Sequence, residues 1–236
     1  MNRPGIIRRA VLRLLTPLLQ GWYARWNGRE RRIRTDGFDL LIPPGVFHPD
    51  LFLSTRLLAE QVRSLPLAGK TFLDLGTGSG RIALTAARAG AVVTACDINP
   101  DAVACAAHNA GRNGLHITTA LSDQFDALPA HFDAIAINPP YYDRDPSTIG
   151  EHAFLAGEGL SYFQRLFPAL AQRIRSGSEV YMVLSEDLDL ARIWSIARTT
   201  GLVPAPARSA RRWAETTTVF RLLPADGGGG SNHTRG

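Results

Sequence analysis

The chain has 236 residues, of which 45% are apolar and 20% charged, and its formal charge is +5. This composition is typical of one soluble globular domain with an ample core, and it excludes a disordered chain, a collagen and a disulfide-stapled scaffold. Its two cysteines, Cys96 and Cys105, are too few for a disulfide framework or a structural zinc site. They favour a reducing compartment, so we expect a cytoplasmic protein. The histidines show no metal-ligand spacing, and no metal is expected.

The positive charge is concentrated at the N-terminus. Residues 1–37 hold nine arginines against two acids, a net charge of +7, whereas the remaining 199 residues carry −2. Apolar residues recur at helical spacing over residues 6–22 with arginines between them, which predicts a basic amphipathic helix. Arg13 and Pro17 interrupt the apolar run, so a membrane span or a secretory signal is not expected. Two interpretations stay open: the helix packs on its own domain, or it docks on nucleic acid, a ribosome or a membrane surface.

Residues 31–42 are predicted to form a β-hairpin. Two extended segments flank Asp36 and Gly37, a pair that favours the positive φ angles of a hairpin turn. Pro43 and Pro44 stop the hairpin, and a helix begins near Asp50. The apolar face of this helix consists of Leu53, Leu57, Leu58 and Val62. We therefore treat residues 1–42 as an extension that precedes the main domain.

From Lys70 onward, short apolar strands alternate with helical stretches, a pattern that predicts a parallel sheet covered by helices on both faces. The expected strands are 71–75, 92–96, 116–120, 134–138 and 180–185. A connection over 203–215 carries no helix signal, and the last strand, 216–222, is expected to insert antiparallel at the sheet edge. The main domain then spans residues 43–224. Residues 225–236 are rich in glycine and are expected to form a flexible tail.

A glycine-rich loop, Gly-Thr-Gly-Ser-Gly at residues 76–80, follows the first of these strands and precedes a helix over 82–89. Its glycines let the backbone turn sharply and approach a ligand at the carboxyl end of the strand, where open α/β sheets bind ligands. A dinucleotide loop needs glycine where this chain has Arg81, and a Walker loop needs Gly-Lys-Ser/Thr. Asp74 precedes the loop; it would repel pyrophosphate but suits a ligand that carries an ammonium or a sulfonium.

Two further acids follow the next two strands. Asp97 can accept hydrogen bonds from both ribose hydroxyls of an adenosine, and Asp123 can accept from an adenine amine. One aspartate at such a position is weak evidence, because capping and surface aspartates are common. Three of them at successive strand ends, with the glycine loop between, indicate a site for a positively charged nucleoside ligand.

The tetrapeptide Asn138-Pro139-Pro140-Tyr141 ends the fourth strand. The prolines fix φ and remove two backbone donors, which leaves carbonyl groups available as acceptors. If the Asn138 side-chain oxygen and the Pro139 carbonyl each accept one N–H of a planar NH2 group, its lone pair is directed toward an electrophilic methyl group. Tyr141 can stack on the planar group. The alternative is a proline-rich turn that merely ends a strand.

The acids and the glycine loop together resemble the motifs of class I S-adenosylmethionine-dependent methyltransferases. The resemblance implies an α/β fold: a doubly wound, mostly parallel, seven-stranded Rossmann-like sheet with an antiparallel last strand. It also implies S-adenosyl-L-methionine as cofactor, with Asp74 and the loop at the methionine part, Asp97 at the ribose and Asp123 at the adenine. The implied cofactor-binding residues are Asp74, Gly76, Thr77, Gly78, Gly80, Asp97, Ile98, Asp123 and Asn138.

The tetrapeptide resembles the signature of methyltransferases that act on planar NH2 groups, namely HemK/PrmC-type glutamine N5 enzymes and adenine N6 enzymes of DNA and RNA. The hairpin, residues 41–49 and residues 157–163 are similar to the HemK/PrmC group, although His48-Pro49-Asp50 replaces its R-P-x-x-E motif. The resemblance implies catalysis by residues 138–141. A protein glutamine is the first choice of acceptor. Adenine N6 or guanine N2 of RNA or DNA, or a small-molecule amine, remain alternatives.

One patch stays outside these motifs. Arg208, Arg211, Arg212 and Trp213 lie in the connection before the last strand and can hold RNA or an acidic protein segment. A solvated loop is an equally good interpretation.

Overall fold

The computed structural model describes residues 28–50, 53–129, 131–140, 145–146, 152, 155–175, 177–212 and 215–225. The predicted N-terminal helix, the predicted tail after residue 225, Tyr141 and Trp213 lie outside the described residues. In the part of the chain that is described, no helix combines the length and the apolarity needed to cross a membrane.

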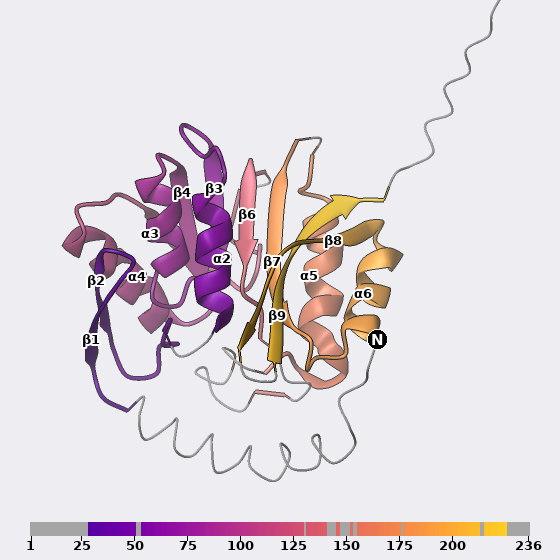
Figure 1. The fold of residues 1–236 in the computed structure, drawn as a ribbon, viewed down its shortest axis with the longest axis horizontal. Helices are drawn as coiled ribbons and strands as arrows, with labels where there is room; N and C mark the ends of the chain where they lie inside the picture. The colour runs from indigo at the N-terminus through magenta and orange to yellow at the C-terminus, as the bar shows by residue number, and fades with distance from the viewer. Residues whose placement is uncertain are drawn as a thin grey trace, which may run out of the picture.

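A seven-stranded sheet forms the centre of the molecule (Figure 1). The strands are β3 (Thr71–Leu75), β4 (Val92–Asp97), β5 (Thr118–Leu121), β6 (Ala134–Ile137), β7 (Glu179–Ser185), β8 (Leu202–Arg212) and β9 (Glu215–Pro224). Their spatial order is β5-β4-β3-β6-β7-β9-β8, and β9 alone runs antiparallel to its two neighbours. The doubly wound, mostly parallel Rossmann-like sheet is therefore confirmed.

Helices cover both faces of this sheet. Successive strand residues point to opposite sides, so each face presents apolar side chains that a layer of helices buries. The helices are α2 (Leu53–Arg63), α3 (Arg81–Arg88), α4 (Pro100–Arg112), α5 (Ser161–Ala171) and α6 (Leu190–Thr199), with a 3-10 turn η2 (Glu158–Leu160) before α5. Phe72 and Ala134 belong to a buried cluster with residues of α2 and α3, whereas Leu73 and Ile135 belong to a second cluster with residues of α5 and α6.

The predicted connection over 203–215 is wrong, because most of it is the edge strand β8. The last strand, β9, does not lie at the edge but pairs with β7 on one side and with β8 on the other. Pro204 and Pro206 obscured the strand pattern, since proline cannot donate to a ladder. An edge strand tolerates them because one of its sides needs no partner, and a register shift between Pro206 and Arg208 relaxes the pairing further.

The predicted hairpin is confirmed as β1 (Arg31–Thr35) and β2 (Phe38–Ile42). Asp36 and Gly37 form its turn with φ angles of 50° and 74°. It stands beside α4 (Figure 1), and the apolar face of β2 packs against that helix. The Asn109 side chain of α4 accepts from the Leu41 backbone N–H (2.8 Å) and donates to the Leu41 carbonyl (3.1 Å). The Asn109 side chain of α4 thus satisfies backbone groups at the open edge of the hairpin.

Candidate active site

A pocket of about 240 Å³ opens at the carboxyl edge of the sheet, around the ends of β3, β4 and β6. From β3 the chain proceeds outward to β4 and β5 on one side, and it then returns to β6 on the other side of β3. The gap between β3 and its neighbours is therefore the switch point where such sheets bind ligands. The predicted site residues that line it are Asp74, Gly76, Thr77, Gly78, Asp97, Ile98, Asp123, Asn138, Pro139 and Pro140. Gly80 does not line the pocket, and Tyr141 lies outside the described residues.

The glycine loop closes onto the neighbouring strand and helix. The backbone N–H groups of Gly76 and Thr77 both donate to the Cys96 carbonyl at 2.9 Å, which fixes the loop against the end of β4. Gly80 has a φ of 85°, and a Cβ there would lie 3.0 Å from the Cα of Ala106 on α4. Gly80 is therefore needed for the close packing of α3 against α4, rather than for direct contact with a ligand.

Asp74 is 3% exposed, and one of its carboxyl oxygens holds the loop. Its Oδ2 accepts from the Thr77 hydroxyl at 2.7 Å and from the Ala83 backbone N–H at 3.0 Å. Burial raises the pKa of this carboxyl to about 7, since an ionised group loses its hydration there. Asp74 therefore titrates near neutrality, and a positive charge placed beside it would favour its ionised form.

Asp97 ends β4 and contacts the same loop. Its Oδ2 accepts from the Gly78 backbone N–H at 3.0 Å, and its Oδ1 accepts from the Asn99 backbone N–H at 2.9 Å. Burial raises the pKa of the Asp97 carboxyl, and these backbone hydrogen bonds oppose that shift. Asp97 is thus held with both oxygens in a fixed orientation at the pocket, as recognition of a vicinal diol requires.

Asp123 lies in the pocket but has a partner that the sequence did not reveal. Its Oδ2 pairs with the Arg165 guanidinium of α5 at 2.8 Å. The neighbouring residue Gln124 donates through Nε2 to the Tyr162 carbonyl at 3.0 Å, which ties this loop to the start of α5. Arg165 lies two residues after the segment 157–163, which is similar to the HemK/PrmC group. The position of this cation beside that segment is the signal in the sequence that could have indicated it.

Asn138 is the first residue after β6, beside the glycine loop. Its side-chain Nδ2 donates to the hydroxyl of Thr55 on α2 at 3.4 Å. Thr55 is 5% exposed and lines the same pocket. Sequence reasoning missed this residue, because a threonine within an apolar helix face carries no motif.

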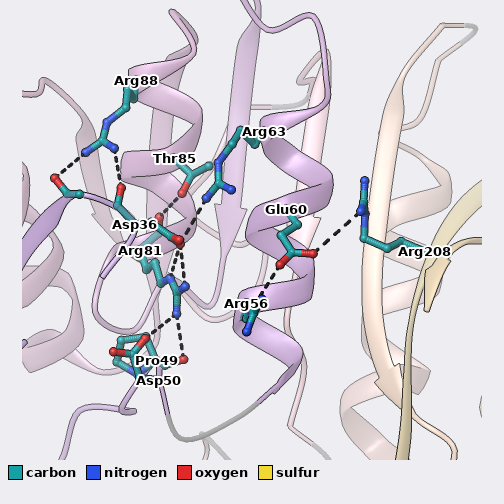
Figure 2. A network of polar contacts seen from close by, with 11 residues as sticks. Asp36, Pro49, Asp50, Arg56, Glu60, Arg63, Arg81, Thr85, Arg88 and Arg208 are labelled. Atoms are coloured by element: carbon teal, nitrogen blue, oxygen red, sulfur yellow. Dashed lines mark hydrogen bonds and ion pairs between the residues drawn. The ribbon is translucent and has the colours of Figure 1, made fainter. Parts of the chain in front are cut away.

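Arg81 lines the pocket and also contacts the hairpin turn. Figure 2 shows its contacts with Asp36, Pro49 and Asp50. Its guanidinium is 3% exposed and pairs with Asp36 in the hairpin turn at 2.6 Å and with Asp50 at 2.8 Å. It also donates to the Pro49 carbonyl at 3.2 Å. Phe47 and Pro49 line the pocket. Arg81 therefore holds the segment that forms one wall of the site. From the sequence, this residue served only to exclude a dinucleotide loop.

Comparison with known proteins identifies the group to which this arrangement belongs. The sequence model of the family described as "Methyltransferase small domain" matches residues 37–208, which is most of the chain. The chain belongs to the methyltransferase small domain family. This methyltransferase is similar to the human protein named Methyltransferase HEMK2, with 30% identity over 192 residues, covering 75% of this chain and 89% of the relative.

The chain is also similar to other methyltransferases. A release factor glutamine methyltransferase of Bordetella pertussis is 35% identical over 159 residues, but the match spans only 56% of that protein and 61% of this chain. Among solved structures, a T. thermophilus 16S rRNA methyltransferase in complex with AdoMet and guanosine superposes with a TM-score of 0.60. It is 23% identical and covers 82% of this chain and 50% of its own, so it supports the fold alone.

The enzyme is an S-adenosylmethionine-dependent methyltransferase, and its pocket fits this cofactor. Four aspartates line the pocket, Asp74, Asp97, Asp123 and Asp145, and carboxylates suit a ligand that carries a sulfonium and an ammonium group. Gly78 lines the pocket with a φ of 52°, a left-handed conformation that favours glycine. Among the described residues, no three His, Cys, Asp or Glu side chains gather as ligands of a metal ion would.

Proposed function

We propose that this enzyme methylates a planar NH2 group, and that its acceptor is the side-chain amide of a protein glutamine. The observation that carries the proposal is the position of Asn138, Pro139 and Pro140 in the wall of the pocket that also contains the glycine loop. Two carbonyl acceptors next to a cofactor site suit a substrate with two N–H donors.

The chemistry needs orientation rather than a strong base. When bound, the cofactor supplies a methyl group on a positively charged sulfur. The Asn138 side-chain oxygen and the Pro139 carbonyl accept the two N–H groups of the acceptor, which aligns its nitrogen lone pair and stabilises the charge that develops on it. A nitrogen–carbon bond forms as the carbon–sulfur bond breaks, its electron pair stays on sulfur, and one N–H proton then leaves to water.

The names of the relatives favour glutamine over other planar NH2 groups. The Bordetella pertussis relative is named a release factor glutamine methyltransferase, and a Methanocaldococcus jannaschii relative, 30% identical over 161 residues, is named a putative protein N5-glutamine methyltransferase. The match covers 79% of the latter and 65% of this chain. These names support a protein substrate with an accessible glutamine.

A purine amine of RNA or DNA is the second candidate, favoured by the charge of the N-terminal part. Residues 1–37 carry a net +7, and Arg29 and Arg34 of the hairpin segment are exposed. Docking of a polyanion through the basic helix predicted over residues 6–22 is part of this candidate. The same carbonyl pair would accept the exocyclic amine of adenine N6 or guanine N2.

We also propose the following assignments. The catalytic residues are Asn138, Pro139, Pro140 and Tyr141, and the cofactor-binding residues are Asp74, Gly76, Thr77, Gly78, Asp97, Ile98, Asp123 and Asn138. Gly80, which the sequence also assigned to the cofactor, shapes the loop through its packing against α4 and does not line the pocket. The catalytic domain spans residues 43–224, after an extension over 1–42 and before a tail over 225–236. Two free, buried cysteines support a location in the reducing cytoplasm.

The decisive experiment offers wild-type enzyme labelled cofactor with three acceptors: a cell protein extract, total RNA and genomic DNA. Label in protein that digestion and mass spectrometry assign to methylglutamine supports the proposal. Label confined to RNA or DNA contradicts glutamine and supports the second candidate. Asn138→Ala is the matched variant: transfer should fall by at least about a hundredfold, while calorimetry finds the affinity for S-adenosylhomocysteine within a few fold. Undiminished transfer by Asn138→Ala would refute the assigned role.

A further inference from the structure

We propose that Arg165 is a further cofactor-binding residue, and that it forms with Asp123 a pair that recognises the adenine base of the cofactor. The Asp123 carboxylate accepts from the adenine amine, and the Arg165 guanidinium donates to a ring nitrogen beside that amine. The inference rests on one part of the proposed function, the assignment of Asp123 to the adenine. It does not depend on the identity of the methyl acceptor.

The two side chains meet in the wall of the pocket. Asp123 follows β5, Arg165 lies on α5, and both residues line the pocket. Arg165 Nη1 lies 2.8 Å from Asp123 Oδ2. The hydrogen-bonding roles of this pair are fixed, because an ionised carboxylate only accepts and a guanidinium only donates. The pair therefore presents an acceptor and a donor side by side.

Adenine presents the complementary pattern along its edge. Its exocyclic amine donates, and the ring nitrogens on either side of that amine, N1 and N7, accept. Guanine carries the acceptor O6 in place of the amine, so it would place that oxygen against the carboxylate. The ion pair need not open for the base, since a guanidinium has five N–H donors and a carboxylate accepts at two oxygens.

The position of the pair along the sheet edge also fits the base. The strands that end at the pocket lie in the order β6-β3-β4-β5. They are followed by Asn138, the glycine loop, Asp97 and Asp123 in that order. Asn138 and Asp123 thus lie toward opposite ends of the pocket. A cofactor with its methyl group at the Asn138 end therefore places its adenine at the end that holds Arg165.

The backbone fixes the two partners relative to each other. Gln124 Nε2 donates to the Tyr162 carbonyl at 3.0 Å, which ties the loop after β5 to α5, three residues before Arg165. The helix itself is anchored, because Phe163 and Phe167 are fully buried. Gln124 has a φ of 51°, a left-handed conformation that is strained in a residue other than glycine. Strain of this kind collects at ligand sites, where the surrounding structure holds it in place.

The fold does not depend on this ion pair. The Arg165 side chain is 55% exposed and that of Asp123 is 38% exposed, and water screens such pairs so that they add little stability. Arg165→Met should therefore unfold at the same urea concentration as wild type. A change in ligand affinity in this variant then reports on the pocket.

Arg165→Met tests the pair, and Arg221→Met is the matched control. Arg221 also forms a partly exposed ion pair, with Glu179 at 3.0 Å, but Glu179 starts β7, at the edge of the sheet opposite to the pocket. Calorimetry measures the affinity of each full-length variant for S-adenosylhomocysteine and for two analogues of it, in which carbon replaces N1 or N7 of the adenine. The measurement needs no methyl acceptor.

We expect Arg165→Met to bind S-adenosylhomocysteine about tenfold more weakly, as for the loss of one charge-assisted hydrogen bond, and Arg221→Met to stay within about twofold of wild type. Wild type should bind one of the two analogues about tenfold more weakly than S-adenosylhomocysteine, whereas Arg165→Met should bind that analogue and S-adenosylhomocysteine equally. Unchanged or tighter binding of S-adenosylhomocysteine by Arg165→Met overturns the proposal. So does equal binding of all three ligands by wild type, or a preference against the analogue that persists undiminished in Arg165→Met.

Asp123→Ala separates the pair from the assignment on which it rests. If Asp123→Ala binds S-adenosylhomocysteine as tightly as wild type, the assignment of Asp123 to the adenine is refuted, and the pair with it. Weaker binding by Asp123→Ala together with unchanged binding by Arg165→Met refutes only the role of Arg165.

Discussion

At the scale of single residues, Asp74 links the shape of the cofactor loop to its charge. Its Oδ2 holds Thr77 and the start of α3, while burial raises the pKa of the carboxyl to about 7. In the free protein the Asp74 carboxyl therefore keeps its proton up to about neutral pH. Its contribution to the free energy of unfolding is full below pH 4 and is lost as the pH rises from about 4 through 7. A cation bound in the pocket reverses this preference, because it stabilises the ionised carboxylate.

Cofactor affinity should depend on pH through this group. Below pH 7, binding of S-adenosylmethionine expels the Asp74 proton, so affinity should rise by at most tenfold per pH unit and level off above pH 7. Calorimetry in buffers of different ionisation enthalpy measures the released proton directly. Asp74→Asn should bind more weakly and with a flatter pH profile. A slope that survives unchanged in Asp74→Asn would assign the proton to another group, such as the buried carboxyl of Asp97.

At the scale of secondary-structure elements, the turn from β3 into α3 depends on one close approach between helices. Gly80→Ala places a Cβ 3.0 Å from the Ala106 backbone at a φ of 85°. We expect a loss of about 3 kcal/mol in the free energy of unfolding, measured by urea titration. Gly111→Ala on α4 is the control, because no atom lies within 4 Å of its added Cβ, and it should gain up to about 1 kcal/mol. Equal effects of the two substitutions would contradict the packing argument.

The hairpin is joined to the pocket through a buried cation. Arg81→Met removes the charge that pairs with Asp36 and Asp50, so the hairpin turn and the wall at residues 45–49 lose their common anchor (Figure 2). We expect a loss of about 2 to 3 kcal/mol of stability and a several-fold weaker affinity for S-adenosylhomocysteine. Urea titration and calorimetry measure the two effects.

Arg32→Met provides the comparison for Arg81. Arg32 also pairs with a hairpin carboxylate, Asp39, but its side chain is 58% exposed, whereas that of Arg81 is 3% exposed. Each carboxylate keeps a second arginine, Arg112 at Asp39 and Arg63 at Asp36, so the two substitutions differ in burial. Water screens the Arg32–Asp39 pair, and its removal should change stability and cofactor affinity little. If Arg32→Met matched Arg81→Met in both measurements, burial of the Arg81 network would not be what anchors the hairpin.

At the scale of the whole molecule, charge and chemistry occupy different parts of the chain. The cofactor pocket is lined by four aspartates, whereas the excess of arginine lies in residues 1–37. The proposed docking by the arginine-rich part and the proposed methyl transfer in the pocket therefore rest on different parts of the chain.

Removal of residues 1–27 tests the docking role of the arm. The deleted segment holds Arg3, Arg8, Arg9, Arg13 and Arg25. If it binds a polyanion, the affinity for a single-stranded RNA oligonucleotide should depend less steeply on salt, with the logarithmic slope reduced by about 0.7 for each phosphate that the arm neutralises. Fluorescence anisotropy over a series of salt concentrations measures this slope. The same slope in the full chain and in the shortened chain would leave the arm without a role in docking.

The sequence alone determined the features that depend on neighbours along the chain. The Asp36-Gly37 turn, the alternation of strand residues and the loop after Asp74 follow from backbone preferences and side-chain periodicity, which act over a few residues. Because parallel strands end at one edge of the sheet, the same reasoning also placed Asp97 and Asn138 at a common pocket.

Only the tertiary structure decided which distant residues meet. The pairing of β9 between β7 and β8, the hold of Thr55 on Asn138 and the contact of Arg81 with Asp36 each join segments that are far apart in sequence. Local pattern carries no signal for such contacts, since one hydroxyl or one guanidinium fits many environments. The packed fold fixes their partner, because a buried polar group must find one within reach.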